Sequence, residues 1–356
     1  MPDTYTISLE NIIYSSYVKL DRLERIVYDT FSNTSIASAT NLNVFIDLYS
    51  VMKQIFSEHF RTEIKDQTGI ISCIINMCGH YRSFFKRLGV HTTFYLIASS
   101  NTCEYNERFF AGYNATFKAK SEIKLFRQIA DVNYELMKVL CPYLPDIHFI
   151  KSNKNYEVAV IIAYLIEMLN DGKPNLIISK DMYPVQLCTM YPYTSYLYPF
   201  KKKGEGDFSI MIPINEKPSF QYQFWKMISD WHKFDINHVL DIHPSNISLL
   251  WALNRFPPRD ISTFQNIQTA KKIILDLSGN NGKVTPEMMQ YDTKYNNIYF
   301  MTQSRYNALD VSFMLMYYKQ DPESKQILLT NLRDDAKVNE INAKFLSENP
   351  IDLSRL

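Results

Sequence analysis

Glycine is scarce in this chain, with 9 residues among 356, and the scarcity limits how the backbone can bind ligands. At average usage, a chain of this length carries about 25 glycines. Loops that cradle phosphates rely on glycine, because it lets the backbone approach closely and adopt positive φ angles. Neither G-x-G-x-x-G nor G-x-x-x-x-G-K-[ST] occurs, so the sequence gives no support for a Rossmann dinucleotide site or a P-loop.

The chain also has few cysteines and almost no net charge. The five cysteines form no C-x-x-C pair, so we expect neither a disulfide framework nor a zinc knuckle. The chain carries 38 Lys and Arg against 37 Asp and Glu, a formal net charge of +1. That balance excludes a generally basic surface for nucleic acid, although it is compatible with a local basic groove.

Long apolar runs and a secretion signal are lacking as well. The longest apolar run, from Val158 to Ile166, has nine residues and is too short to span a bilayer. The first residues, MPDTYTISLE, have no basic and apolar regions of a signal peptide. We therefore expect an intracellular protein, cytoplasmic or virion-associated and not secreted, with no membrane partner. The many Tyr, Asn, Ile and Lys residues are typical of AT-rich genomes and suggest a viral protein.

What the sequence does contain is an alternation of strand and helix patterns. Runs rich in β-branched and aromatic residues predict five strands, at 42–46, 92–97, 146–150, 175–179 and 195–199. Helical spacing of apolar residues lies between them, over 48–60, 70–88 and 157–169. This alternation predicts an α/β fold in which a parallel sheet is flanked by helices.

Composition divides the chain into three parts. Residues 1–40 show helical spacing followed by the polar stretch SNTSIASAT, which predicts an N-terminal helical extension. Residues 41–200 form the predicted α/β core. Residues 201–356 begin with the loop sequence KKKGEGD and continue as a mostly helical C-terminal region.

Three acidic residues follow predicted strands. Asp47 ends the first, Glu157 opens the helix after the third, and Asp181 follows the fourth. The carboxyl ends of parallel strands meet at one edge of a sheet, so these side chains can converge there. Carboxylate oxygens are the ligands that Mg²⁺ and Mn²⁺ prefer. Each acid also lies where a helix begins, so capping explains each one equally well.

The order of these segments resembles the flap-endonuclease and phage 5′-nuclease family, within the wider PIN-like fold. The resemblance rests on IDLYS at 46–50, NYEVAVIIA at 155–163 and LIISKDMYPVQL at 176–187. The basic segment RFFAGYNATFKAK, at 108–120, is similar to the helical arch of that family. Residues 248–276 are similar to its helix–hairpin–helix element, which binds the backbone of duplex DNA.

The resemblance implies specific roles for eight residues. Asp47, Glu157 and Asp181 would be the catalytic residues and the ligands of Mg or Mn, which activates water for phosphodiester hydrolysis. Nucleic-acid contacts would come from basic side chains that neutralise phosphates. These are Arg108, Lys118, Lys120, Lys271 and Lys272.

Several acids of the family pattern are missing from this chain. The acid expected after the second strand is replaced by Ala98. The two Asp of the family's Glu-Ala-Asp-Asp helix start fall at Ala159 and Val160, or at the neighbouring Val158. The second Asp of Ser-Gly-Asp-Lys-Asp falls at Tyr183. The hairpin glycines are also missing, from 265–269. Loss of half the acids predicts a weak second metal site.

The sequence therefore favours a flap-nuclease-like protein with an eroded two-metal carboxylate site. We expect it to be inactive or weakly active and to serve as a nucleic-acid-binding or structural component. One alternative is an active divalent-metal-dependent 5′ nuclease, a 5′–3′ exonuclease or flap endonuclease. Another is a purely structural assembly protein. The expected partners are DNA and other proteins, the latter bound through residues 1–40 and the aromatic segment 191–200.

Overall fold

The computed structural model describes a defined set of residues of this chain. They are residues 41–52, 68–87, 89–98, 104–111, 113, 121–144, 146–151, 156–202, 206–212, 215, 218–254, 267–279 and 282–321. The predicted extension at 1–40, Lys118 and Lys120 lie outside them. The middle of the predicted DNA-binding hairpin, at 255–266, does so too.

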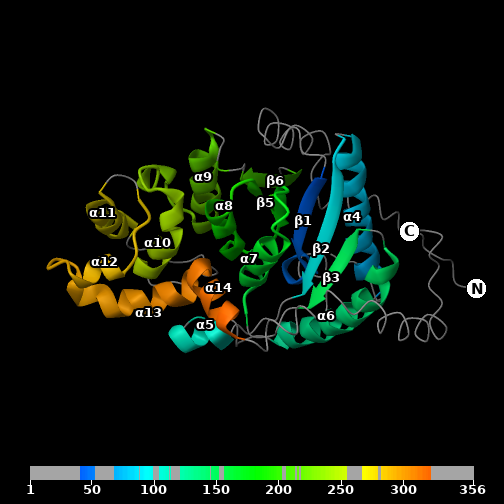
Figure 1. Ribbon diagram of the computed structural model, residues 1–356, viewed down its shortest axis with the longest axis horizontal. Helices are drawn as coiled ribbons and strands as arrows, with labels where there is room; N and C mark the ends of the chain where they lie inside the picture. The colour runs from blue at the N-terminus through cyan, green and yellow to red at the C-terminus, as the bar shows by residue number, and fades with distance from the viewer. Residues whose placement is uncertain are drawn as a thin grey trace, which may run out of the picture.

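A six-stranded sheet forms the centre of the α/β half of the molecule (Figure 1). Its strand order is β3-β2-β1-β4-β5-β6. Neighbouring strands from β3 to β5 pair in parallel, and β6 pairs antiparallel with β5. The strands are β1 (Asn41–Asp47), β2 (His91–Ala98), β3 (Ile147–Lys151), β4 (Asn175–Ile178), β5 (Thr194–Lys202) and β6 (Gly206–Ile212). The predicted parallel sheet with flanking helices is confirmed, and β6 extends it beyond residue 200.

Both faces of the sheet are buried, which explains why its strands are almost continuously apolar. In β1, Val44 and Ile46 belong to a hydrophobic cluster that also contains residues of α4 and α6. Phe45, between them, belongs to a second cluster that contains α7. This division follows from the alternation of side chains along a strand.

The helices form a layer on each face of the sheet and a larger group beyond α7 (Figure 1). Those of the α/β half are α4 (Thr68–Arg87), α5 (Glu104–Phe109), α6 (Ser121–Leu140), η3 (Cys141–Tyr143), α7 (Val158–Leu169), η4 (Tyr183–Gln186) and α8 (Leu187–Met190). Those that follow β6 are α9 (Phe220–His232), η5 (Ile236–His238), η6 (Pro244–Asn246), α10 (Ile247–Leu253), α11 (Ile267–Ser278), α12 (Glu287–Gln290), η7 (Asn296–Ile298), α13 (Tyr299–Leu309) and α14 (Val311–Gln320).

Helix α7 lies between the sheet and α14, and its sequence VAVIIAYLIEML is apolar on nearly every side. Its first six residues are all buried. The helix ends at Asn170, which adopts a left-handed conformation with φ 36°. Because α7 contacts protein on opposite sides, one hydrophobic cluster continues from Phe45 in the sheet to Trp225 in α9 and Met314 in α14.

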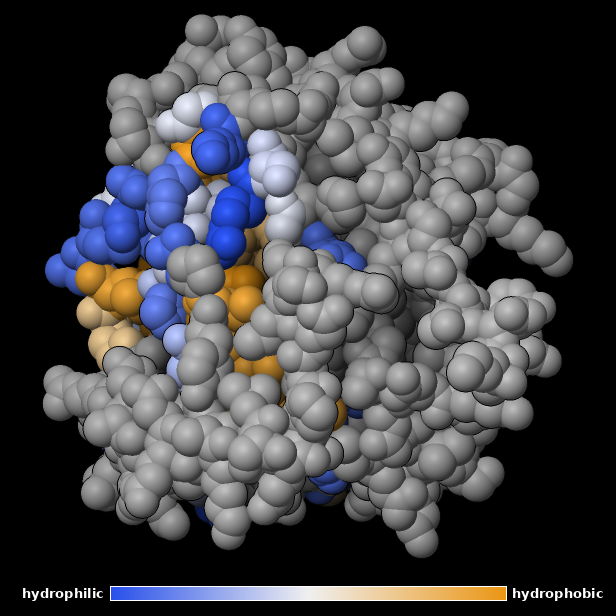
Figure 2. All heavy atoms as spheres, turned by 90° about the vertical axis from the view of Figure 1, so that its right-hand side faces the viewer, coloured by the Kyte–Doolittle hydropathy of each residue, from blue (hydrophilic) through white to orange (hydrophobic). Residues whose placement is uncertain are grey.

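The surface on the α4 and α6 side carries hydrophilic and apolar side chains next to each other (Figure 2). In α6, Asp131 and Glu135 are exposed while Tyr134 and Met137 are buried, as expected of an amphipathic helix. Within the described ranges, no helix combines the length and the apolar character needed to cross a membrane.

Candidate carboxylate site

Asp47 and Ser179 leave the sheet side by side. Strands β1 and β4 are neighbours, and Ile46 pairs with Ile178, so the next residue of each strand reaches the same edge. The Ser179 hydroxyl donates a hydrogen bond to Asp47 Oδ2 at 2.7 Å, and the backbone N–H of Ser50 donates to Oδ1 at 3.2 Å. Asp47 is 3% exposed, so these bonds form away from solvent.

Asp181 is held in the same network through its backbone. Its N–H donates to Ser179 Oγ at 2.9 Å. The Ser50 hydroxyl oxygen accepts from the N–H of Lys180 at 3.0 Å and lies 3.4 Å from Ser179 Oγ. The buried Tyr196 hydroxyl lies 2.8 Å from the carbonyl oxygen of Ser179 and 2.6 Å from that of Asp181. The loop after β4 is therefore fixed from both sides.

Burial is the main influence on the pKa of Asp47. It raises the pKa of this carboxyl to about 6, since the charged form loses its hydration. The hydrogen bond from Ser179 opposes the shift, and the negative charge of Asp181 raises the pKa further. Asp47 and Asp181 are thus close enough to act on each other electrostatically.

Glu157 occupies a different environment, at the N-cap of α7. It is 2% exposed, and its Oε1 accepts a hydrogen bond of 2.7 Å from the Tyr113 hydroxyl. Tyr113 is itself 1% exposed, and its ring meets that of Tyr183 edge-on with centroids 6.5 Å apart. The third acid is therefore covered by a phenol from the segment that resembles the family's helical arch.

Hydrogen bonds from backbone N–H groups that follow in the chain account for part of the position of two acids. Asp47 accepts from the N–H of Ser50, and Asp181 Oδ1 accepts from the N–H of Tyr183 at 3.1 Å. Glu157 makes no side-chain cap bond. Its conformation therefore needs another explanation, and its contact with Tyr113 provides one.

The three acids do not form a cluster suited to two metal ions. In the part of the chain that the structure describes, no three His, Cys, Asp or Glu side chains are grouped as metal ligands. A two-metal centre needs carboxylates for each of two ions about 4 Å apart. The structure brings Asp47 and Asp181 together, and this donor set does not fit such a centre.

The side chains predicted to contact nucleic acid differ in their exposure and in the protein groups that they already contact. Arg108 is exposed, and its guanidinium lies 4.4 Å from the centre of the Tyr105 ring. Lys271 forms an ion pair of 2.6 Å with Asp241, whereas Lys272 is exposed. Their role in nucleic-acid binding stays a prediction.

Sequence reasoning missed three residues that define this site. Ser50 and Ser179 hold Asp47, and Tyr113 holds Glu157. Ser179 directly follows β4, as Asp47 ends β1, so its position at the strand end was an available signal. No comparable signal marks Tyr113, which lies 44 residues before its partner.

Comparison with known proteins supports the fold. No protein-family model and no curated protein sequence matches the chain. A crystal structure of the T5 D15 protein, co-crystallised with metal ions, matches with a TM-score of 0.52 and 10% identity, over 84% of this chain and 99% of that chain. A structure of the bacteriophage T5 D15 flap endonuclease with DNA and metal ions gives 0.47 and 12%, over 86% and 98%. The first of these matches establishes that the chain has a flap-nuclease-like fold.

Proposed function

We propose that this protein is a flap-nuclease-like component with an eroded two-metal site, inactive or weakly active as a nuclease. In this proposal it binds nucleic acid or supports an assembly, and it is viral in origin. Asp47, Glu157 and Asp181 are what remains of the catalytic, metal-binding set. Arg108, Lys271 and Lys272 are the proposed nucleic-acid contacts, together with Lys118 and Lys120.

The observation that carries the proposal is the pairing of the surviving acids with protein groups. Asp47 accepts from Ser179 and Ser50, and Glu157 accepts from Tyr113. These bonds occupy some of the acceptor positions of each carboxylate and leave fewer of them for metal ions. Such pairing supports a site that has adapted to structural stability rather than to holding two metal ions.

One observation favours an active 5′ nuclease as the second candidate. The charge of Asp181 raises the pKa of Asp47, so the two acids repel each other. A divalent cation bound between them would relieve that repulsion. In that case Mg²⁺ or Mn²⁺ would be the cofactor, Asp47 and Asp181 would hold it, and it would supply activated water for phosphodiester hydrolysis.

A cleavage assay separates these two candidates. The protein is incubated with flap and nicked DNA in Mn²⁺, beside an Asp47→Asn variant and with Asp131→Asn as an exposed-acid control. We expect cleavage at, or barely above, the level of buffer alone by all three proteins. Cleavage by the wild type that disappears in Asp47→Asn and persists in Asp131→Asn would establish the active alternative and contradict the proposal.

Salt dependence separates nucleic-acid binding from pure assembly. We expect labelled flap DNA to bind with an affinity that falls as salt rises, because each phosphate contact releases counterions. Replacing both Arg108 and Lys272 with Gln should lower the affinity and flatten the slope by roughly two contacts. The paired surface residue Lys173, changed to Gln, serves as the control. Fluorescence anisotropy measures the binding, and no binding even at low salt leaves only the assembly protein.

A further inference from the structure

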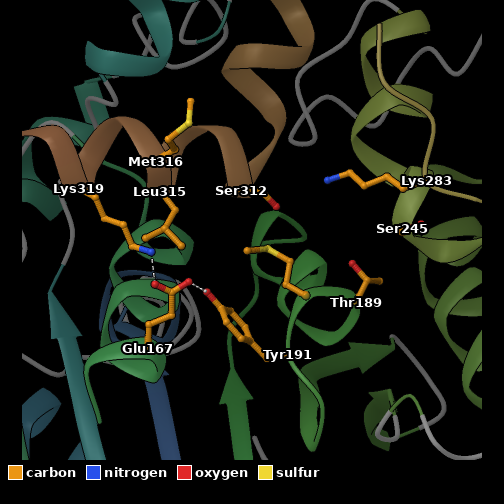
Figure 3. A pocket seen from close by; sticks show the side chains of 10 residues that line it. Glu167, Thr189, Tyr191, Ser245, Lys283, Ser312, Leu315, Met316 and Lys319 are labelled. Carbon is orange, nitrogen blue, oxygen red and sulfur yellow. Dashed lines mark hydrogen bonds and ion pairs between the residues drawn. The ribbon is translucent and has the colours of Figure 1, made fainter. Parts of the chain in front are cut away.

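A cavity of about 420 Å³ opens between α7, α8 and α14, and its lining does not include Asp47, Glu157 or Asp181 (Figure 3). Its volume lies in the range of small-ligand sites, which are mostly apolar with a few placed polar groups. Met190, Leu315 and Met316 supply apolar surface. Lys283 and Lys319 supply positive charge near opposite ends (Figure 3).

Helix α14 forms one whole side of this cavity. Ser312, Leu315, Met316 and Lys319 line it at positions i, i+3, i+4 and i+7, which is a single helix face. Seven residues at 1.5 Å each separate the first from the last, or about 10 Å. That span suits an elongated molecule with different chemistry at its two ends.

The end near Lys283 is suited to an anion. Asn246 fixes the backbone on both sides of this lysine, since it donates to the carbonyl of Gly282 at 3.1 Å and accepts from the N–H of Val284 at 2.7 Å. The ammonium group is 3.3 Å from Asp310 Oδ2, a long contact that uses one of its three donors. The lysine points toward the Ser312 hydroxyl across the cavity (Figure 3).

The other end offers hydrogen-bond acceptors. Glu167 accepts from the Tyr191 hydroxyl at 3.1 Å and forms an ion pair with Lys319. A carboxylate has about four acceptor positions, so it can accept more. Thr189 does not belong to this end, since it lies on the side of Ser245 and Lys283 (Figure 3). Donor groups of a ligand, such as an amino group, fit here.

We propose that this cavity binds a nucleoside monophosphate whose base carries an exocyclic amino group. The phosphate lies at Lys283 and Ser312, the base lies against Met190 and Met316, and the amino group donates to Glu167. Such a nucleotide has a phosphate at one end, a flat base in the middle and an amino group at the other end. The cation, the apolar side chains and the carboxylate follow one another in the same order along α14.

Calorimetric titration of the full-length protein with adenosine monophosphate tests the proposal. We expect saturable one-to-one binding, and binding weaker by roughly ten-fold or more for adenosine, inorganic phosphate and inosine monophosphate. Inosine monophosphate matters because it replaces the amino group with a carbonyl. Equal binding of adenosine or phosphate overturns the nucleotide assignment, and equal binding of inosine monophosphate overturns the role of Glu167.

Two variants locate the binding in this cavity. Lys283→Met removes the ammonium and keeps the apolar stem. Ser312→Asp places an acid in the first turn of α14, where it suits the helix dipole but repels phosphate, so the fold is retained. Each should weaken binding by roughly ten-fold or more, whereas Lys173→Met, in an exposed ion pair elsewhere, should not. No saturable binding by the wild type, or unchanged binding by Ser312→Asp, overturns the proposal.

Discussion

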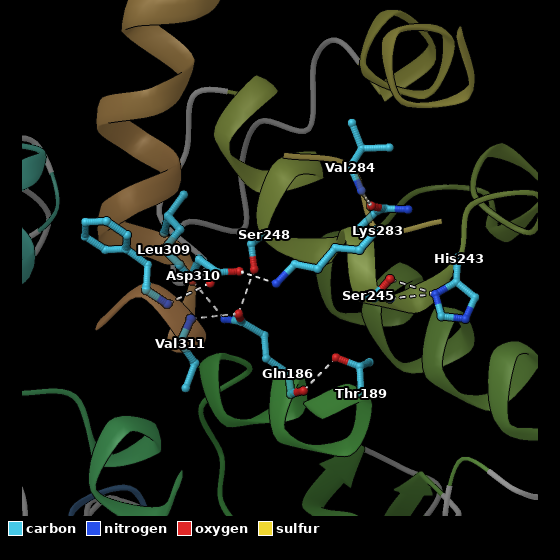
Figure 4. A network of polar contacts seen from close by, with 12 residues as sticks. Gln186, Thr189, His243, Ser245, Ser248, Lys283, Val284, Leu309, Asp310 and Val311 are labelled. Atoms are coloured by element: carbon cyan, nitrogen blue, oxygen red, sulfur yellow. Dashed lines mark hydrogen bonds and ion pairs between the residues drawn. The ribbon is translucent and has the colours of Figure 1, made fainter. Parts of the chain in front are cut away.

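Two buried aspartates at the starts of helical segments show opposite ways of keeping a negative charge inside this protein. Asp47 is held by Ser179 and the backbone of Ser50, with Asp181 nearby. Asp310 is equally buried, and it accepts from the N–H of Phe313 at 2.9 Å and faces the ammonium of Lys283 (Figure 4). One acid lies near another acid, and the other lies near a cation.

The two acids therefore differ in their electrostatic surroundings. Asp47 lies near a second negative charge, whereas Asp310 belongs to a network of hydrogen bonds and an ion pair. We define the Asp310 junction as Gln186, Ser248, Lys283, Asp310 and Val311. There the Gln186 side chain accepts from Ser248 and from the N–H of Val311, and it donates to the carbonyl of Leu309 (Figure 4). Every contact at this junction is complementary, so it should contribute more stability than the region around Asp47.

Gln186→Leu should have the largest effect on the free energy of unfolding. It removes four buried hydrogen bonds, the weakest of them to the carbonyl of Tyr183, and leaves their partners unpaired, a loss of about 4 kcal/mol. Urea unfolding measures it, with the exposed Gln290→Leu as the control. A loss as small as that of the control would show that the Asp310 junction is not a stability centre.

Asp47→Asn should change how stability depends on pH. The folded-state pKa of Asp47 is about 6, against an ordinary 3.8, so the folded protein binds this proton more tightly than the unfolded chain does. The contribution of Asp47 to the free energy of unfolding is fully present below pH 3.8, and it is lost as the pH rises through 6. The loss is at most about 3 kcal/mol.

The measurement is urea unfolding of both proteins between pH about 4 and about 7. The wild type should lose stability relative to Asp47→Asn as pH rises, whereas the exposed Asp131→Asn should follow the wild type. If the difference in unfolding free energy between wild type and Asp47→Asn stays constant across this interval, the pKa of Asp47 is not raised in the folded protein.

Tyr113→Phe should have the smallest effect of the three. It removes the 2.7 Å hydrogen bond to the buried Glu157 carboxylate and keeps the ring, which costs about 2 kcal/mol. The matched control is Tyr291→Phe, because Tyr291 is 85% exposed. If both variants unfold at the same urea concentration, the hydroxyl of Tyr113 does not stabilise the region of the acids.

The strands and helices could be predicted from the sequence because they depend on the local periodicity of apolar residues. The strand predicted at 92–97 is β2, His91–Ala98, and the helix predicted at 157–169 is α7, Val158–Leu169. The β-branched runs and the apolar helix are visible within a few residues of chain. The aromatic segment 191–200 leads into β5, where Tyr196 and Tyr198 are buried.

The polar partners could not be predicted in the same way. Ser179 and Asp47 are 132 residues apart, and their contact depends on the pairing of β1 with β4. Serine carries no charge and no periodic signal that would mark it as a partner. The sequence identified the acids themselves, whereas only the tertiary packing determines whether an acid meets a serine, a phenol, a cation or another acid.

The enclosed position of α7 has a consequence for how the molecule opens. Its backbone amides lie behind the sheet on one side and α14 on the other, so solvent reaches them only after those layers part. Amide hydrogens in such a helix exchange through the largest openings of a protein. Helix α7 thus ties the sheet and the C-terminal helices into one cooperative unit, and neither half can melt without exposing its apolar surface.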